Sequence, residues 1–202
     1  MKNKLFLSIL LTVVVFELGF SQVRFGLRGS AGITNITNVH QESKSRTGFQ
    51  IGVSALIPIL NNDILYFEPE INYSAQGEFY VPSKIYPGAD KQKIFMDYIN
   101  IPLNAKLYFS DAENELFAVL GPYVGFKVGD TIERINKPTE MDDYKYNSFD
   151  MGATIGFGYS FNRSLEISVR YYYGFVDQVE NDAVDKNNST SNLNFGVSYI
   201  FP

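Results

Sequence analysis

The only histidine of the chain lies in a run of residues that could do nucleophilic chemistry. His40 is followed by Glu42 and Ser43, and a histidine, a carboxylate and a serine are the residue types of a hydrolytic triad. No strand or helix pattern surrounds the run to hold it rigid, and no oxyanion donors are evident beside it. We therefore interpret His40 as a solvated loop residue, and we expect no catalytic residues and no enzymatic activity.

Carboxylates gather in two polar stretches, residues 130–143 and 177–185, and oxygen ligands suit hard cations. They could hold Ca²⁺ or bridge lipopolysaccharide phosphates through divalent cations, but their spacing is not that of an EF-hand. With one histidine and no cysteine, a His-rich or thiolate metal site is excluded. We interpret both stretches as solvated surface and expect no metal and no cofactor.

A third set of charged residues alternates with apolar ones along extended segments of the chain. Side chains in a strand point alternately to opposite faces, so these charges share a face with Gly, Ser and Asn, opposite an apolar face. The set comprises Arg24, Arg28, Glu68, Glu70, Lys106, Lys127, Asp150, Glu166 and Arg170.

Eight segments of this kind must position those charges. The last one runs from Asn192 to Phe201, with Leu193, Phe195 and Val197 on its apolar face and Ile200 as the exception on the polar face. No segment shows the 3.6-residue period of a helix over three turns. Prolines donate no ladder hydrogen bond, so we expect bulges or strand ends at Pro69, Pro102 and Pro122. The predicted strands are residues 23–34, 47–58, 64–77, 94–109, 115–128, 148–161, 165–177 and 192–201.

The connections between the segments alternate strictly in length. Short turns rich in Asn, Asp and Ser occupy residues 59–63, 110–114 and 162–164. Long polar links occupy residues 35–46, 78–93, 129–147 and 178–190, so all of them lie at one end. In outer-membrane barrels the short turns are periplasmic and the long loops face outside. Four phenylalanines near the short-turn end would then form a periplasmic aromatic girdle: Phe67, Phe109, Phe161 and Phe201.

Alternation alone is compatible with two kinds of barrel. A membrane barrel has its apolar face outside, whereas a soluble lipocalin-type barrel buries its apolar face inside. Here the apolar face is bulky, aromatic and nearly free of charge, whereas the opposite face carries small residues that fit inside a narrow barrel. An apolar face of that size exposed to water would be an aggregation hazard. We predict an all-β fold, an eight-stranded antiparallel up-and-down transmembrane β-barrel whose last strand seals against the first.

Inside such a barrel the charges must be paired, because a buried charge is tolerated only with partners and hydrogen bonds. We predict a salt-bridge network in which Arg28 and Arg170 meet Glu68 and Glu70 near mid-height. Lys127 and Asp150 should lie closer to the outer rim, although the exact partners depend on the barrel's shear. The interior would then be plugged by side chains, and the protein would be no general porin.

The first 21 residues form a separate module. Lys2 and Lys4 precede an apolar core over residues 5–16, and Gly19 and Ser21 suit a cleavage site, so we predict a cleavable signal peptide over residues 1–21. Residues 22–202 form the barrel domain. The formal net charge of -5 argues against nucleic acid as a partner.

The ordered motifs of the mature chain resemble the PorT-type outer-membrane β-barrel family of Bacteroidetes. They cover essentially all of it: FGLRGSAGI from Phe25, TGFQIG from Thr47, FEPEINYS from Phe67 with Gly77, YINIPL from Tyr98, GPYVG from Gly121 and RYYYG from Arg170. The resemblance implies a barrel in the outer membrane. It implies little about the task, although some members of the family are linked to protein secretion and gliding.

From these observations we expect a non-enzymatic outer-membrane protein, structural or adhesive, that presents its outer loops. Association with a secretion or gliding system is a lesser option. The alternatives are a small barrel enzyme acting on lipid or peptide at the membrane rim, and a soluble lipocalin-like ligand-binding barrel. We expect a monomer whose partners are outer-membrane lipid and lipopolysaccharide, with protein partners reached through the long loops.

Overall fold

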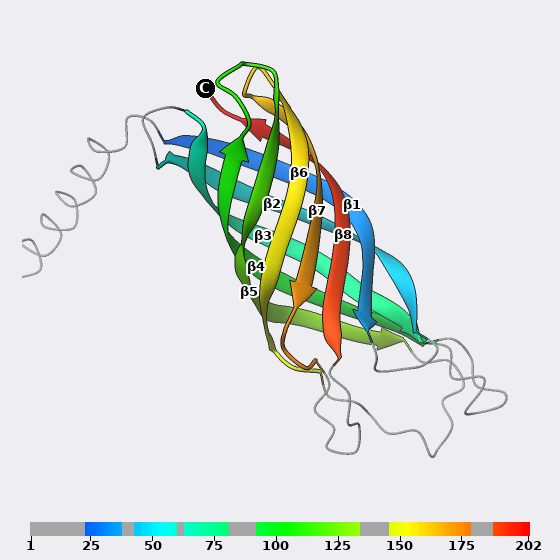
Figure 1. Cartoon of the computed structure of the whole chain (residues 1–202). Coiled ribbons are helices and arrows are strands. Elements are labelled where there is room, and N and C mark those ends of the chain that lie inside the picture. The colour runs from blue at the N-terminus through cyan, green and yellow to red at the C-terminus, as the bar shows by residue number, and fades with distance from the viewer. Residues whose placement is uncertain (1–22, 38–42, 60–62, 81–91, 134–145, 179–187) are drawn as a thin grey trace, which may run out of the picture.

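The computed structural model describes residues 23–37, 43–59, 63–80, 92–133, 146–178 and 188–202 (Figure 1). The predicted signal peptide lies outside the described residues, as do His40, Glu42 and the middle of each long link. No helix in the described part of the chain is long and apolar enough to cross a bilayer.

The described residues form one antiparallel sheet that closes on itself in the order β1 to β8 (Figure 1). The last strand pairs with the first from Gly26 opposite Ile200 to Thr37 opposite Ser189. The predicted fold class, an eight-stranded up-and-down barrel, is therefore confirmed. The strands are β1 Arg24–Thr37, β2 Ser43–Pro58, β3 Leu65–Tyr80, β4 Gln92–Tyr108, β5 Glu115–Glu133, β6 Phe149–Phe161, β7 Leu165–Gly174 and β8 Ser189–Ile200.

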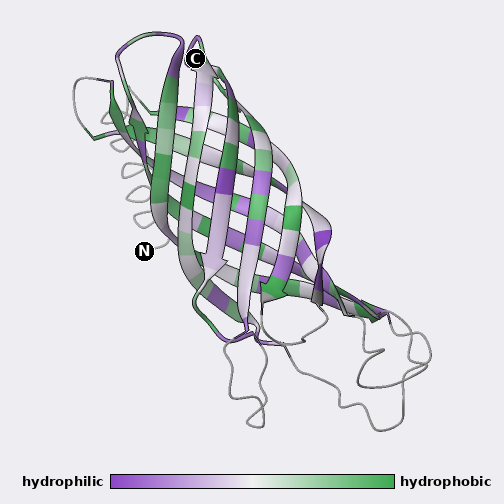
Figure 2. Ribbon diagram, turned by 45° about the vertical axis from the view of Figure 1, so that its right-hand side comes forward, coloured by the Kyte–Doolittle hydropathy of each residue, from purple (hydrophilic) through white to green (hydrophobic). Residues whose placement is uncertain are grey.

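The apolar face points outward and the polar face points inward. Along β7, exposed and buried side chains alternate without interruption. Large outward residues such as Phe25 and Leu120 are 64% and 60% exposed, whereas Ile200, the exception in the pattern, points inward and is buried. Figure 2 shows the same alternation of hydrophobic and hydrophilic residues along the strands. This arrangement is the reverse of a lipocalin-type barrel, so that alternative is wrong.

Several strands continue past the predicted ends into the polar links. The ladder between β4 and β5 reaches Lys93 opposite Glu133, and that between β3 and β4 reaches Tyr80 opposite Gln92. Cross-strand pairing overrides the low strand propensity of these polar residues, since each strand has a neighbour to extend along. We call the end of the barrel where the long links lie the outer end. There, the ends of β2 to β5 extend together past the ends of β6 and β7 (Figure 1).

The prolines neither end strands nor cause bulges, contrary to the sequence-based prediction. Pro69 pairs with Leu103 of β4, and its missing N–H lies on the side of β2, where the ladder skips pairs but resumes in the same register. Each proline therefore costs ladder bonds on one side only. The register shifts lie nearer the outer end, between Ser45 and Phe49 of β2 and between Asp97 and Tyr98 of β4.

Candidate functional site

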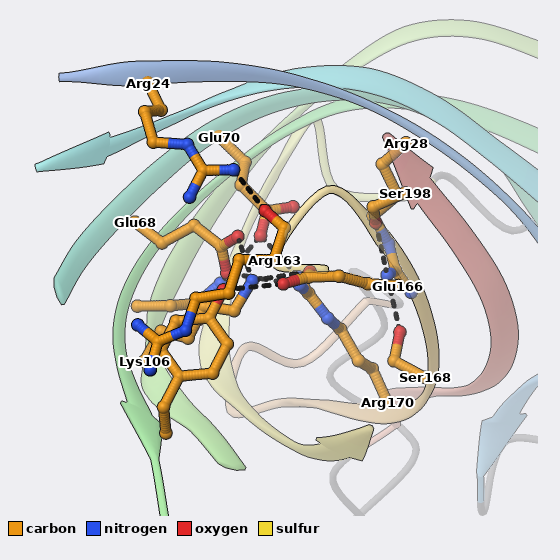
Figure 3. A network of polar contacts seen from close by, with 12 residues as sticks. Arg24, Arg28, Glu68, Glu70, Lys106, Arg163, Glu166, Ser168, Arg170 and Ser198 are labelled. Atoms are coloured by element: carbon orange, nitrogen blue, oxygen red, sulfur yellow. Dashed lines mark hydrogen bonds and ion pairs between the residues drawn. The ribbon is translucent and has the colours of Figure 1, made fainter. Parts of the chain in front are cut away.

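A cluster of ion pairs fills the middle of the barrel (Figure 3). Glu68 and Glu70 occupy successive inward positions of β3. Arg170 of β7 reaches both, with Nη2 3.2 Å from Glu68 and Nη1 paired with Glu70. Lys106 of β4 lies between two carboxylates, 3.1 Å from Glu68 and 2.6 Å from Glu166. All five side chains are buried, so strands far apart in the chain meet here inside the barrel.

Neutral donors complete the carboxylate cluster. Asn104 donates to Glu70 at 3.0 Å and Asn72 donates to its other oxygen at 2.9 Å. Tyr108 donates its hydroxyl to Glu166 at 2.6 Å. Together with Lys106 and Arg170, these donors provide every oxygen of the three glutamates with a partner. Burial of so many charges is tolerable because each is both paired and hydrogen-bonded.

Arg28 does not join these carboxylates, although we predicted that it would. Its Nη1 donates to Ser168 at 2.7 Å and, more weakly, to Ser198 at 3.5 Å. It forms no ion pair with any carboxylate in the part of the chain that the structure describes. The register explains this, because Arg28 pairs with Ser198 of β8 and its side chain extends along β7 and β8. A side chain at Gly196 would collide with the guanidinium, so that glycine leaves the room for it.

The remaining predicted charges lie toward the two ends. Lys127 donates to Asp130 at 3.1 Å and to the carbonyl of Tyr146 at 3.0 Å near the outer rim. Asp150 is buried and accepts from Tyr123 at 2.9 Å and Thr190 at 2.7 Å, hydroxyl donors rather than a cation. Arg24 lies at the short-turn end and donates to the carbonyl of Arg163. The structure thus gathers five of the predicted charges and separates the other four.

Two apolar clusters inside the barrel flank the charged cluster, and we did not predict them. Lys106 illustrates the boundary, since its Nζ lies 4.5 Å from the ring centroid of Phe117. The sequence does contain a signal for these clusters, namely apolar residues at inward positions of the strands. Ile200 is the one such residue that the sequence analysis noted. The cluster nearer the short turns comprises Leu56, Tyr66, Tyr108, Phe117, Val119 and Ile200. The cluster nearer the outer end comprises Ile36, Ile94, Met96, Tyr98 and Tyr146.

Arg163, in the turn between β6 and β7, ties the short turns together across the barrel mouth. Its guanidinium donates to the carbonyl oxygens of Asp63, Ser110 at 3.0 Å and Ala112 at 3.1 Å, and it pairs with Glu115. It also lies 4.5 Å from the Tyr108 ring centroid. A lone arginine in a turn carries no sequence signal for this role. The spatial convergence of three turns creates it.

The four phenylalanines of the predicted girdle face outward near the short-turn end. Phe67, Phe109, Phe161 and Phe201 are all exposed on the barrel exterior. Two of them pack against a tyrosine of the same strand end, with ring centroids 4.8 Å apart for Tyr159 and Phe161 and 5.2 Å apart for Tyr199 and Phe201. Their role as a membrane girdle stays a prediction.

The triad-like run and the possible metal ligands can be followed only in part among the described residues. Ser43, the serine of the triad-like run, begins β2, and its two companions lie outside the described residues. Within the described ranges, no three His, Cys, Asp or Glu side chains gather as metal ligands would.

Comparison with known proteins agrees with this architecture. Among solved structures, the chain is similar to Neisserial surface protein A, with 16% identity, 88% of this chain and 97% of that chain covered, and a TM-score of 0.50. The outer membrane protein OprG from Pseudomonas aeruginosa has 13% identity, with 89% of this chain and 94% of that chain covered and a TM-score of 0.49. The outer membrane enzyme PagL has 13% identity, with 86% of this chain and 98% of that chain covered and a TM-score of 0.45. At these identities the likeness concerns the fold alone. No curated protein sequence matches the chain.

The family comparison goes further than the fold. A family model described as outer membrane protein beta-barrel domain matches residues 14–180, most of the chain. The outward apolar face and the short and long connections agree with that description. The chain therefore belongs to the outer membrane protein beta-barrel domain family, and its place is the outer membrane.

Proposed function

We propose that this protein is a non-enzymatic outer-membrane barrel with a sealed interior, which acts as a scaffold for its outer strand ends and loops. The observation that carries the proposal is the filled interior. Ion pairs of Glu68, Glu70, Lys106, Glu166 and Arg170 lie between two apolar clusters, and their side chains are almost wholly inaccessible. An eight-stranded barrel encloses just enough room for side chains, so this filling supports a closed lumen.

The outer end of the sheet offers a surface for a protein partner. The ladder between β5 and β6 ends at Phe126 opposite Phe149. From Gly129 to Glu133, β5 pairs with β4 alone among the described strands. An unpaired strand edge exposes backbone donors and acceptors to which an extended segment of another protein can add. This edge supports a role in docking or adhesion, at the end where the long links lie.

The finer assignment rests on the sequence motifs. We infer that the chain is a PorT-type barrel of Bacteroidetes, that it is a monomer, and that it works beside a secretion or gliding complex. The non-enzymatic part of the proposal rests on the sequence around His40, where nothing would hold a triad in a fixed geometry.

Single-channel recording in planar bilayers tests the sealed interior. Wild-type protein should insert without a stable open conductance, whereas a wide porin inserted under the same conditions should conduct. Insertion is checked independently by recovering the folded barrel from the bilayer lipid. A stable open conductance from the wild type would contradict the sealed interior and would favour a channel function instead.

Site-specific photo-crosslinking in intact cells tests the docking edge. A photoreactive residue in place of Thr131, on the free part of β5, should give a defined protein adduct. The matched control replaces Asn114, which is exposed in a short turn at the opposite end. The same adduct from both positions, or none from Thr131, would count against a partner at the outer edge.

A further inference from the structure

Basic residues and aromatic rings share the outward face at the outer ends of β2, β3 and β4. Lys44 of β2 lies opposite Phe79 of β3, which lies opposite Lys93 of β4, so the three form one row across the strands. Their neighbours Glu78 and Ile94 point inward, which places the row on the barrel exterior. The face therefore carries cations on the side where the membrane lies.

Arg46 is held on the same face beside this row. Its Nη1 donates to the carbonyl of Gln76 at 2.8 Å, and its guanidinium carbon lies 3.8 Å from the ring centroid of Phe95. Gly77 leaves the space, since a Cβ there would lie 3.2 Å from Arg46 Nη1. The side chain is thus fixed across the strands, where its planar fork is pre-organised for an oxyanion.

Two carboxylates, those of Glu133 and Asp97, lie near these cations. Arg46 and Lys44 form no ion pair with a carboxylate among the residues that the structure describes. Lys93 pairs with Glu133 at 2.7 Å, but both side chains are about half exposed. Such an exposed pair is worth little and exchanges partners readily. Asp97 is the other acid on this face, and it attracts the Arg46 guanidinium but forms no ion pair with it in the described part of the chain.

The position of these residues matches the headgroup layer. Along the outward side of β4, the uninterrupted apolar run ends at Ile99, and Asp97 is the first polar residue beyond it. With a rise of about 3.3 Å per residue, Phe95 lies roughly 7 Å beyond Asp97 along the strand, and Lys93 lies roughly 13 Å beyond Asp97. A strand tilt of about 40° reduces these to roughly 5 and 10 Å in height. The headgroup layer is about 5–7 Å thick on each side, so Arg46 lies within it. The backbone of the two lysines lies about 3–5 Å beyond it, a distance that their long side chains can span.

We propose that Lys44, Arg46 and Lys93 form a binding site for a phosphate group of outer-leaflet lipopolysaccharide. Arginine binds phosphate through two N–H groups and lysine as a point charge, both as charge-assisted hydrogen bonds. Phe79 and Phe95 offer apolar surface to the adjoining glycolipid. The site lies on the exterior of the barrel, outside the sealed lumen, and it adjoins the outer segment of β5 through Lys93 and Glu133.

Titration of the folded barrel in detergent micelles with bisphosphorylated lipid A tests the site, with binding followed by native mass spectrometry. Arg46→Gln and Lys44→Gln should each weaken lipid binding about tenfold, the size of a lost charge-assisted hydrogen bond. Arg46→Lys should recover part of the loss. The matched control is Lys127→Gln, which removes a positive charge at the same end but on the inner face.

A change of ligand tests whether binding requires the phosphate group. Lipid A without phosphate should bind the wild type about as weakly as bisphosphorylated lipid A binds Arg46→Gln, and inorganic phosphate should not displace the lipid. Equal weakening by Lys127→Gln would reduce the effect to net charge and overturn the proposal. Unchanged binding in Lys44→Gln, whose exposed side chain is not needed for folding, would overturn it too.

Discussion

At the scale of single residues, Glu70 is a buried carboxylate held by three side-chain donors. It accepts from Arg170, Asn72 and Asn104 while fully enclosed by the barrel. Such a group contributes less through the energy of its pair than through the cost of leaving its partners alone. Removal of one member of a buried pair leaves an uncompensated charge, which costs about 3–5 kcal/mol.

We therefore expect Glu70→Ala to lower the unfolding free energy of the barrel in lipid vesicles by about 3–5 kcal/mol, because Arg170 then loses a buried partner. Urea titration of the refolded protein measures it. The control is Glu133→Ala, which breaks the exposed pair with Lys93 and should cost less than about 1 kcal/mol. Similar losses for both variants would mean that the buried pair carries no special cost.

Arg163 gives a second prediction at this scale. Arg163→Lys keeps the charge but cannot reach the carbonyls of Asp63, Ser110 and Ala112 at once, so stability should fall by about 1–3 kcal/mol. Asn162→Gly is the control for the turn backbone. Asn162 has a positive φ of 50°, which glycine adopts freely, so this change leaves the turn intact and removes none of the Arg163 contacts. If Arg163→Lys matched the wild type in urea titration, the arginine would not tie the turns together.

At the scale of elements, the β2–β3 irregularity depends on Gly77. Its φ of 142° lies in a region that favours glycine, and the hydroxyl of Thr34 on β1 accepts from its N–H at 3.0 Å and donates to its carbonyl at 2.7 Å. The side chain of a third strand thus replaces ladder bonds that the register shift removes. The bulge therefore joins β1, β2 and β3.

Gly77→Ala should destabilise the barrel by about 1–3 kcal/mol, because alanine is strained at this φ and its Cβ would collide with the carbonyl of Ile94. Gly29→Ala is the matched control, since a Cβ there meets nothing within 4 Å. Urea titration of both variants separates local strain from a general glycine effect. Equal stability of the two would show that the bulge is not strained by a side chain.

The lipid-facing strand surface gives a further prediction. Leu103, outward on β4, is exposed at the level of the apolar band. Leu103→Arg should cost about 2–4 kcal/mol in lipid vesicles, because it places a charge near mid-bilayer. Thr131→Arg, beyond the apolar band on β5, should cost no more than about 1 kcal/mol. Equal costs would contradict the assigned depth of the two positions.

At the scale of the whole molecule, we predict that the short turns face the periplasm and the long links face outside. A cysteine at Thr131, near the outer strand ends, should react in intact cells with a membrane-impermeant maleimide. Cysteines at Asn114 and Asn162, exposed in the short turns, should react only after the outer membrane is permeabilised. The chain has no cysteine of its own, so labelling is unambiguous. The reverse pattern would invert the topology.

The sequence alone determined the fold class, because period-two alternation over eight segments admits few architectures. It also predicted which residues of each regular strand share a face, since a residue's parity in a strand decides its face. The contrast between Asn- and Asp-rich short turns and long polar links was enough to predict which strand ends lie together. These properties are local, so composition and spacing carry them.

Only the tertiary structure decided which charges meet. Arg170 and Arg28 both point inward, but the register between β7, β8 and β1 sends one to the glutamates and the other to serines. It also decided that strands run through their prolines, that apolar side chains close the interior, and that Arg163 joins three turns. Each of these depends on the stagger of strands distant in sequence, a long-range quantity that no single segment encodes.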